Sequence, residues 1–197
     1  MNRSFLALTA MAALLASCAS SKIPKERQVT VQTKLNFKKQ SAGGADAYYT
    51  LEMVSDGDER SVYWPEDAPG PGALSKGRSY TVELLEEEYG LGMGGEGASY
   101  WSPELFRLSD GDRLLYDASV CRVHGAGMKR AVVPISYGFP MFERSYSTAM
   151  ESEFPNAGVV LGGCCVNWER PSTHAWVCPR CVENKRGWEK ENPKTNF

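Results

Sequence analysis

The chain has 197 residues, of which 42% are hydrophobic and 23% charged, and its formal net charge is −2. This composition is typical of a globular protein, and the mildly acidic balance gives no reason to expect nucleic acid as a partner. The six cysteines and only two histidines are few enough for their positions to be informative.

The first residues have the pattern of a secretory signal. Arg3 is followed by an apolar run from Phe5 to Ala16. A run of this length is too short to span a membrane, which needs about 20 apolar residues, so residues 1–17 are predicted to be a signal peptide. Its removal leaves about 180 residues, enough for one medium domain or two small ones.

The end of this segment, Leu15-Ala16-Ser17-Cys18, resembles the lipobox of bacterial lipoproteins. The resemblance implies cleavage before Cys18, acylation of its thiol and anchoring in a membrane of the cell envelope. The absence of aspartate after Cys18 implies the outer membrane, with the protein facing the periplasm. Residues 18–28 are polar, without apolar periodicity, and are predicted to be the lipidated tether.

Residues 29–118 are predicted to form a small β domain. Asp56-Gly57 and Asp110-Gly111 each lie between β-favouring runs, which indicates two hairpins. Residues 28–37 and 79–89 add further strand-like runs, for about six strands in all. The expected fold is α+β and mostly β: an OB-like barrel or a sandwich, followed by a Cys/His module with one or two short helices.

Two groups of residues in this β region have a simple structural interpretation. The run Glu86 to Glu88 is expected to be a solvated face of a strand or turn. Adjacent aromatic residues are expected to place one ring in the core and its neighbour at the surface, rather than to line a ligand groove. These aromatic residues are Tyr48, Tyr49, Tyr63, Trp64, Tyr100 and Trp101.

All cysteines other than Cys18, and both histidines, lie between residues 121 and 181, within the predicted Cys/His module (residues 119–197). Cys121 and His124 are separated by two residues, as are Cys178 and Cys181. This spacing lets both donors of a pair face one ion, and three sulfurs with one nitrogen are a common ligand set for structural Zn²⁺.

The local sequence fits this interpretation. Gly125 follows His124, where a metal-binding knuckle commonly requires positive φ, and Pro179 between the two later cysteines favours the start of a helix. The arrangement resembles a treble-clef or zinc-ribbon site and, more loosely, a Cys/His module of uncharacterised bacterial proteins. It departs from compact versions because one pair is Cys/His and about fifty residues separate the pairs. Residues 141–154 within this interval have the apolar periodicity of an inserted helix.

Other interpretations of the cysteines stay open at this stage. Cys164, Cys165 or His174 are alternative metal ligands, although His174 also suits a surface position and the adjacent cysteines suit a tight bend. Disulfides fit an oxidising compartment, but five mature cysteines would leave one unpaired. A redox dithiol at Cys178 and Cys181 lacks the length of chain that a thioredoxin-like fold needs after the motif.

The sequence shows no arrangement of nucleophile and base, and this favours a non-enzymatic role. We therefore expect an envelope lipoprotein with a structural Zn²⁺ site that binds or scaffolds another component, such as an envelope protein. The alternative functions are reversible metal handling and thiol–disulfide exchange by the Cys178–Cys181 pair.

Overall fold

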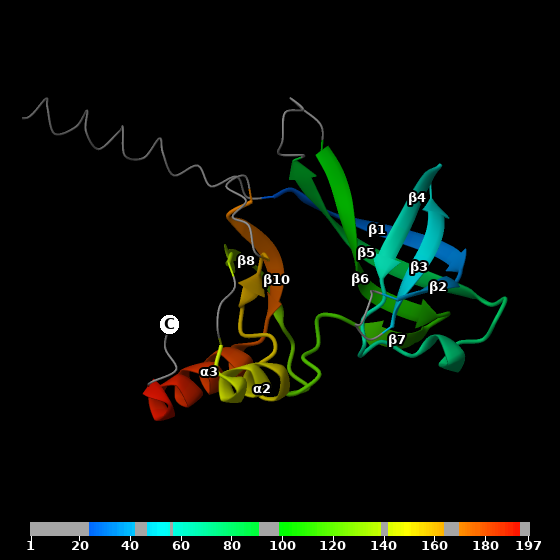
Figure 1. Cartoon of the computed structure of the whole chain (residues 1–197). Coiled ribbons are helices and arrows are strands. Elements are labelled where there is room, and N and C mark those ends of the chain that lie inside the picture. Colours follow the sequence, from blue (N-terminus) through cyan, green and yellow to red (C-terminus); the bar gives the residue numbers. More distant parts are fainter. Residues whose placement is uncertain are drawn as a thin grey trace, which may run out of the picture.

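The computed structural model describes residues 24–41, 47–55, 57–90, 99–138, 142–163 and 170–193. Figure 1 shows a large β-sheet on one side of the molecule and a small sheet with two helices on the other. The predicted signal peptide and Cys18 lie outside the described residues. Within those residues, no helix is long and apolar enough to cross a membrane.

The large sheet has seven strands: β1 (Glu26–Lys34), β2 (Asn36–Gln40), β3 (Tyr48–Ser55), β4 (Asp58–Tyr63), β5 (Ser79–Gly90), β6 (Ser99–Asp110) and β7 (Arg113–Asp117). Their order is β1-β5-β6-β4-β3-β2, with β7 also paired to β6. The pairs are antiparallel except β4 with β6, which are parallel. A 3₁₀ helix, η1 (Pro71–Ala73), lies between β4 and β5.

The two ends of this strand order, β1 and β2, are consecutive in sequence and separated only by Leu35. They form one bent run of chain, which pairs with β5 at one end and with β3 at the other. The sheet is not closed into a barrel by hydrogen bonds within the described residues. The mostly β prediction is therefore confirmed. Of the two predicted forms, a barrel or a sandwich, the barrel is not closed within the described residues.

Both predicted hairpins are present. Strands β3 and β4 pair across a turn at Gly57, and β6 and β7 pair across a turn at Gly111. The φ angles of these glycines are +84° and +57°, a region that glycine occupies without the steric penalty of a Cβ atom. The sequence signal was reliable here because the requirement is local to the turn.

The core of the large sheet is almost entirely apolar. Leu51, Val62, Leu84 and Leu108 are among its fully buried side chains, and they come from four different strands. Trp64 is also buried, while its neighbour Tyr63 is 53% exposed, as expected for adjacent aromatic residues. The remaining buried members are Val31, Met53, Ala68, Tyr80, Val82 and Leu105.

The expectation that Glu86 and Glu87 are solvated is wrong. Glu86 is 1% exposed and Glu87 is 5% exposed, on opposite faces of β5. Arg27 and Arg60 each form an ion pair with Glu86, with N–O distances of 2.7 and 2.6 Å. A strand covered on both faces buries consecutive residues, and a buried carboxylate is tolerated when it is paired and hydrogen-bonded.

The Cys/His module has a three-stranded sheet ordered β10-β8-β9 and two helices. Its elements are β8 (Lys129–Ser136), α2 (Arg144–Ser152), β9 (Val160–Leu161), β10 (Ser172–Val177) and α3 (Pro179–Glu191). The predicted inserted helix is therefore present as α2, and the prediction of one or two short helices is confirmed. Buried Tyr146 belongs to the expected apolar stripe of α2.

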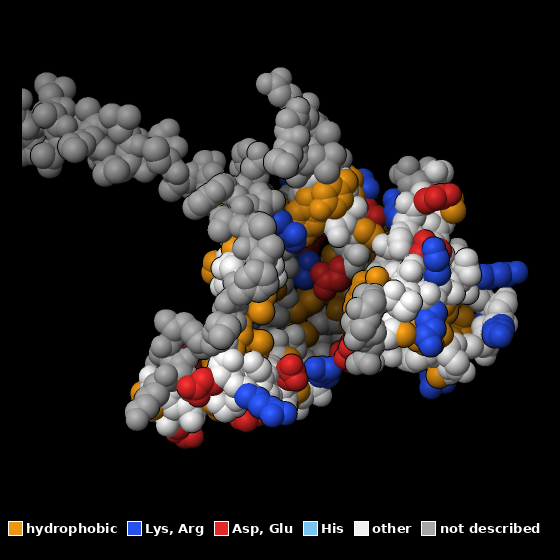
Figure 2. All heavy atoms as spheres, in the orientation of Figure 1, with side chains coloured by type: hydrophobic (Ala, Val, Ile, Leu, Met, Phe, Trp, Pro, Cys, Tyr) orange, Lys and Arg blue, Asp and Glu red, His pale blue; other side chains and the backbone are white. Residues whose placement is uncertain are grey.

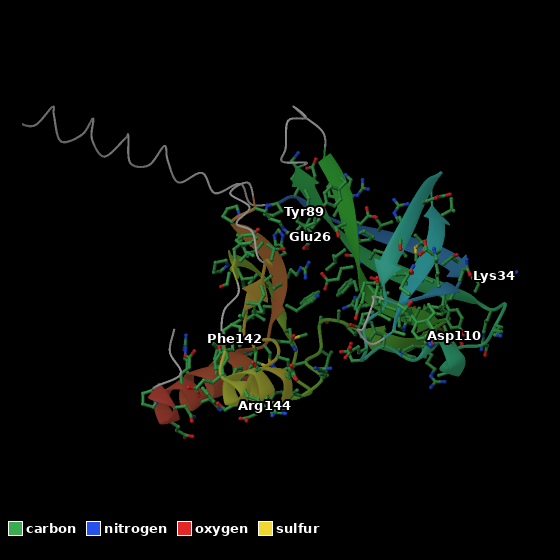
Figure 3. All side chains as sticks on the ribbon, in the orientation of Figure 1. Glu26, Lys34, Tyr89, Asp110, Phe142 and Arg144 are labelled. Carbon is green, nitrogen blue, oxygen red and sulfur yellow. The ribbon has the colours of Figure 1, made fainter. Side chains whose placement is uncertain are left out.

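The two sheets meet through one stacked ring pair and a set of charged groups. The rings of Phe106 and Trp176 stack with centroids 5.4 Å apart. Arg130 lies over Trp176 and bridges Glu26 at 2.8 Å and Glu104 at 3.0 Å. Figure 3 labels Glu26 on the large-sheet side of this junction.

Candidate metal centre

The first pair of candidate ligands lies on a tight knuckle that follows β7. Cys121 N–H donates to the Ala126 carbonyl at 2.9 Å, and Gly125 N–H donates to the Cys121 carbonyl at 2.8 Å. Gly125 has a φ of +58°, which allows the chain to reverse within these few residues. This turn brings the Cys121 sulfur and the His124 ring to the same side of the chain.

The second pair lies where β10 passes into α3. Cys178 is the N-cap residue of α3 and Pro179 is its first residue, as the sequence predicts. Cys178 N–H donates to the carbonyl of Asn156 at 2.9 Å, which attaches this corner to the loop after α2. Cys181 lies one turn into α3, and its side chain is fully buried.

The structure brings Cys121, His124, Cys178 and Cys181 together, with all four potential ligand atoms within 4.8 Å of one another. The Cys121 and Cys181 sulfurs are 3.7 Å apart. From His124 Nδ1, the distances to the sulfurs of Cys121, Cys178 and Cys181 are 3.5, 3.7 and 3.4 Å. This compact group of four donors is suited to holding one metal ion.

These distances agree with the edges of a metal-centred tetrahedron. With usual Zn–S and Zn–N bond lengths, tetrahedral angles place two sulfurs about 3.8 Å apart and a sulfur and a nitrogen about 3.5 Å apart. The sulfur–sulfur distance between Cys121 and Cys181 is 3.7 Å, far beyond a covalent S–S bond of about 2.05 Å. All three cysteines of the cluster are free in this structure, so they are not disulfide-bonded to one another.

The cluster places its thiols in unequal environments. Burial by itself would raise the pKa of Cys121, but hydrogen bonds from the Asn156 side chain and the backbone N–H groups of Val123 and His124 outweigh it and lower that pKa to about 6. Burial and the neighbouring Cys121 and Cys178 sulfurs raise the pKa of Cys181 to about 12. Without a cation, the cluster therefore resists accumulating negative charge, and a bound dication would remove this penalty.

The second ring nitrogen of His124 contacts a residue that the sequence did not identify as part of the site. The Asn184 side-chain amide lies 3.0 Å from His124 Nε2. A ligating histidine usually uses its other nitrogen to donate to an oxygen, which orients the ring. Rotation of the Asn184 amide would present its oxygen to Nε2–H, because the two amide ends have nearly the same shape.

Asn156 is the second residue that sequence reasoning missed. Its side-chain N–H donates to the Cys121 sulfur at 3.5 Å, while its carbonyl accepts from Cys178. It therefore connects both ligand pairs. Its only sequence signal is its position in a Pro-Asn turn, which is common in proteins and does not indicate a metal site.

The alternative ligands are not part of the described cluster. His174 Nδ1 lies 3.0 Å from Glu87 Oε1, at the junction between the two sheets. Cys164 and Cys165 lie outside the described residues. His174 lies on β10 (Ser172–Val177) and is partly buried at this junction, rather than at the surface as one interpretation of the sequence expected.

A small core of aromatic side chains surrounds the cysteines. The Tyr146 ring lies 5.8 Å from Phe154 and 5.3 Å from Trp188, measured between centroids. Phe142, labelled in Figure 3, packs beside Tyr146 near α2. This apolar cover excludes water from the sulfurs and strengthens their electrostatic interaction with a cation.

Compared with known protein families, curated proteins and solved structures, the chain matches none.

Proposed function

We propose that the protein is a lipid-anchored lipoprotein of the cell envelope, with a structural Zn²⁺ site, that acts as a non-enzymatic binding or scaffolding protein. The observation that carries the zinc assignment is the tetrahedral spacing of the four donors Cys121, His124, Cys178 and Cys181. Three sulfurs and one nitrogen suit Zn²⁺ better than Mg²⁺ or Ca²⁺, which prefer oxygen ligands.

Burial favours a structural role for the metal over exchange or redox chemistry. Cys121, Cys178 and Cys181 are each 0% exposed. A redox dithiol or a metal-handling site needs sulfurs that another molecule can reach, whereas a closed set of four protein ligands is typical of structural zinc. The two alternative functions are therefore less well supported.

We further propose that the large sheet is an OB-like fold. If β1 and β2 are taken as one bent strand, the chain has five strands in Greek-key order, with β7 as an addition. A partly open five-stranded Greek-key barrel is the OB arrangement, and it commonly binds extended ligands. The strand order supports this proposal, together with the single parallel pair β4–β6.

The proposed anchoring rests on the sequence before residue 19. The lipobox-like Leu15 to Cys18 would attach Cys18 to the membrane. The predicted tether of residues 18–28 overlaps β1, which begins at Glu26, so only the residues before β1 would separate the folded part from the lipid surface. An outer-membrane position facing the periplasm would make another envelope protein the expected partner.

The first test is the metal content and free-thiol count of the protein from Ala19 onward, purified without chelator or added zinc. We expect about one zinc per chain, with the cluster thiols reacting only after denaturation in the presence of a chelator. A metal-free protein whose mass shows the loss of two or four hydrogens would contradict the zinc site in favour of disulfides. Radiolabelled palmitate incorporation, compared between the full chain and Cys18→Ser, tests the anchor separately.

A further inference from the structure

A cleft of about 430 Å³ lies between the large sheet and the Cys/His module. Strands β4 and β6 and the loop after β4 contribute one side, and the Cys121 knuckle, the loop after α2 and β10 contribute the other. Figure 2 shows a hollow between the two parts of the molecule, with acidic and basic side chains inside it. Its volume falls within the range of small-ligand sites in proteins.

The large-sheet side of the cleft combines an aromatic ring with a carboxylate. Tyr63 on β4 and Glu104 on β6 are direct partners in the parallel register, so their side chains are neighbours on one face. The Tyr63 residue is 53% exposed and the Glu104 side chain is 47% exposed, so both can be reached by a ligand. An aromatic face beside a carboxylate attracts a cation that has an apolar stem.

The loop after β4 adds further negative charge. Glu66 and Asp67 are exposed and line the same cleft, and the Tyr116 hydroxyl hydrogen-bonds to Asp67. Arg122, on the knuckle, is the one basic residue among the described lining residues. Arg130 reaches Glu104 at 3.0 Å but is shared with Glu26. Glu66 and Asp67 therefore give the large-sheet side a negative potential.

The opposite side offers a hydrogen-bond donor without a partner. The indole Nε1 of Trp176 on β10 is buried and has no hydrogen-bond partner within the described residues. Trp176 lines the cleft, and a buried N–H without an acceptor costs free energy. A peptide carbonyl bound in the cleft would become that acceptor only if the Trp176 ring turned so that this N–H faced the cleft.

The cleft is also connected to the proposed zinc site. Asn156 lines the cleft, and the same residue donates to the Cys121 sulfur and accepts from Cys178. A metal bound to the cluster would therefore fix the module side of the cleft.

We propose that this cleft binds a lysine side chain of a partner polypeptide, with the ammonium among Glu66, Asp67 and Glu104 and the stem against Tyr63. This inference rests on the proposed binding role and specifies its ligand class. Three separate carboxylates suit the compact ammonium of lysine, whose three donors point in different directions, better than the planar fork of arginine, which prefers one carboxylate.

The test is an NMR titration of the zinc-loaded protein from Ala19 onward, which retains every described residue. The probe is the peptide acetyl-Gly-Lys-Gly-amide, and the reporter is the indole N–H signal of Trp176, assigned with Trp176→Phe. We expect a saturable shift of this signal that is absent with the norleucine peptide, which keeps the stem and lacks the charge. The arginine peptide should bind more weakly than the lysine peptide.

The paired variant Glu66→Gln/Asp67→Asn should lower affinity for the lysine peptide about threefold to tenfold, because exposed ion pairs contribute modestly. The matched control Glu59→Gln/Asp112→Asn removes two exposed acids outside the cleft and should leave affinity unchanged. Equal binding of the norleucine peptide, tighter binding of the arginine peptide, or no shift would overturn the lysine proposal. Zinc content is measured on the same sample, so failure of the zinc site is seen independently of the peptide result.

Discussion

The large sheet and the Cys/His module are stabilised by different means. The core of the sheet contains eleven buried residues, all hydrophobic and drawn mainly from its strands. The corresponding cluster of the module has six buried residues, and three of them are cysteines. Small regions with little apolar area usually need a metal or a disulfide to fold. The comparison predicts that hydrophobic burial stabilises the sheet, whereas folding of the module depends on its ligand cluster.

The junction between these two regions differs from both cores, because its buried groups are mainly charged and polar side chains. Buried Glu87 accepts hydrogen bonds from Thr173 Oγ1 at 2.7 Å and from His174 N–H at 2.9 Å. Tyr89 also hydrogen-bonds to Glu87 and receives a hydrogen bond from Arg170 at 2.5 Å. Such a network orients the two regions specifically, because Glu87 lies on the large sheet and the groups of Thr173 and His174 that donate to it lie on β10.

The largest expected effect is that of removing the proposed Zn²⁺ ion. Chelation under mild denaturation, or the variant Cys121→Ser/Cys181→Ser, should unfold the module and leave the large sheet folded. Structural zinc commonly contributes about 10 kcal/mol or more to the folding of small metal-binding units. Hydrogen–deuterium exchange should show lost protection in β10 and α3 and retained protection in β5 and β6.

Restoring protection by adding zinc to the chelated wild-type protein is the control for this experiment. If the amides of α3 stayed protected from hydrogen–deuterium exchange in Cys121→Ser/Cys181→Ser, the module would not depend on its ligand cluster for folding.

The converse experiment weakens the sheet. Leu84→Ala removes a side chain that is 0% exposed in the sheet core, and it should lower the free energy of unfolding by about 2–5 kcal/mol. Chemical denaturation measures this change, and zinc stoichiometry in native buffer should remain that of the wild type. The exposed Leu114→Ala, on β7, is the matched control and should have a much smaller effect. Loss of zinc from folded Leu84→Ala would show that the regions are not separately stabilised.

A third change addresses the junction. Glu87→Gln replaces an acceptor of several hydrogen bonds by an amide and should cost about 1–3 kcal/mol of stability. Although burial raises the pKa of Glu87, hydrogen bonds from Tyr89, Thr173 and His174 outweigh it, and the pKa lies below its ordinary value of 4.5. A lowered folded-state pKa means that this stabilisation is present above pH 4.5 and is lost as the pH falls through the folded-state value.

The pH dependence of unfolding between about pH 5 and pH 3 should therefore be shallower in Glu87→Gln than in the wild type. The control is Glu88→Gln, one position along β5, where the glutamate pairs with the exposed Lys25. The pH dependence of its unfolding free energy should be closer to that of the wild type than the pH dependence of Glu87→Gln is. If the free energy of unfolding of Glu87→Gln depended on pH as steeply as that of the wild type, the Glu87 carboxylate would not stabilise the junction.

The smallest expected effect comes from the residue behind His124. Asn184→Ala should weaken zinc binding about tenfold, since groups that orient a ligating histidine typically contribute tenfold to hundredfold in affinity. Competition with a chromophoric chelator measures this change. The neighbouring Glu183→Gln is exposed on the same helix and should bind zinc as the wild type does. Equal affinities in all three proteins would mean that Asn184 does not orient the ring.

The features that the sequence determined by itself are those with local causes. Gly57 and Gly111 predict their turns because positive φ is a property of one residue, and Pro179 predicts the start of α3 for the same kind of reason. The two-residue spacing within each ligand pair is likewise local, so the pairs were recognisable although about fifty residues separate them.

Tertiary structure alone decided which distant groups meet. Glu86 and Glu87 are buried because β5 is covered on both faces, which no pattern of neighbouring residues reveals. His174 lies with Glu87 rather than with the cysteines, and Asn156 and Asn184 join the ligand cluster from a loop and a helix face. The bend between β1 and β2 also depends on pairing with two different strands. Such pairings arise from long-range packing and from satisfying buried polar groups, so their cause lies outside any short stretch of sequence.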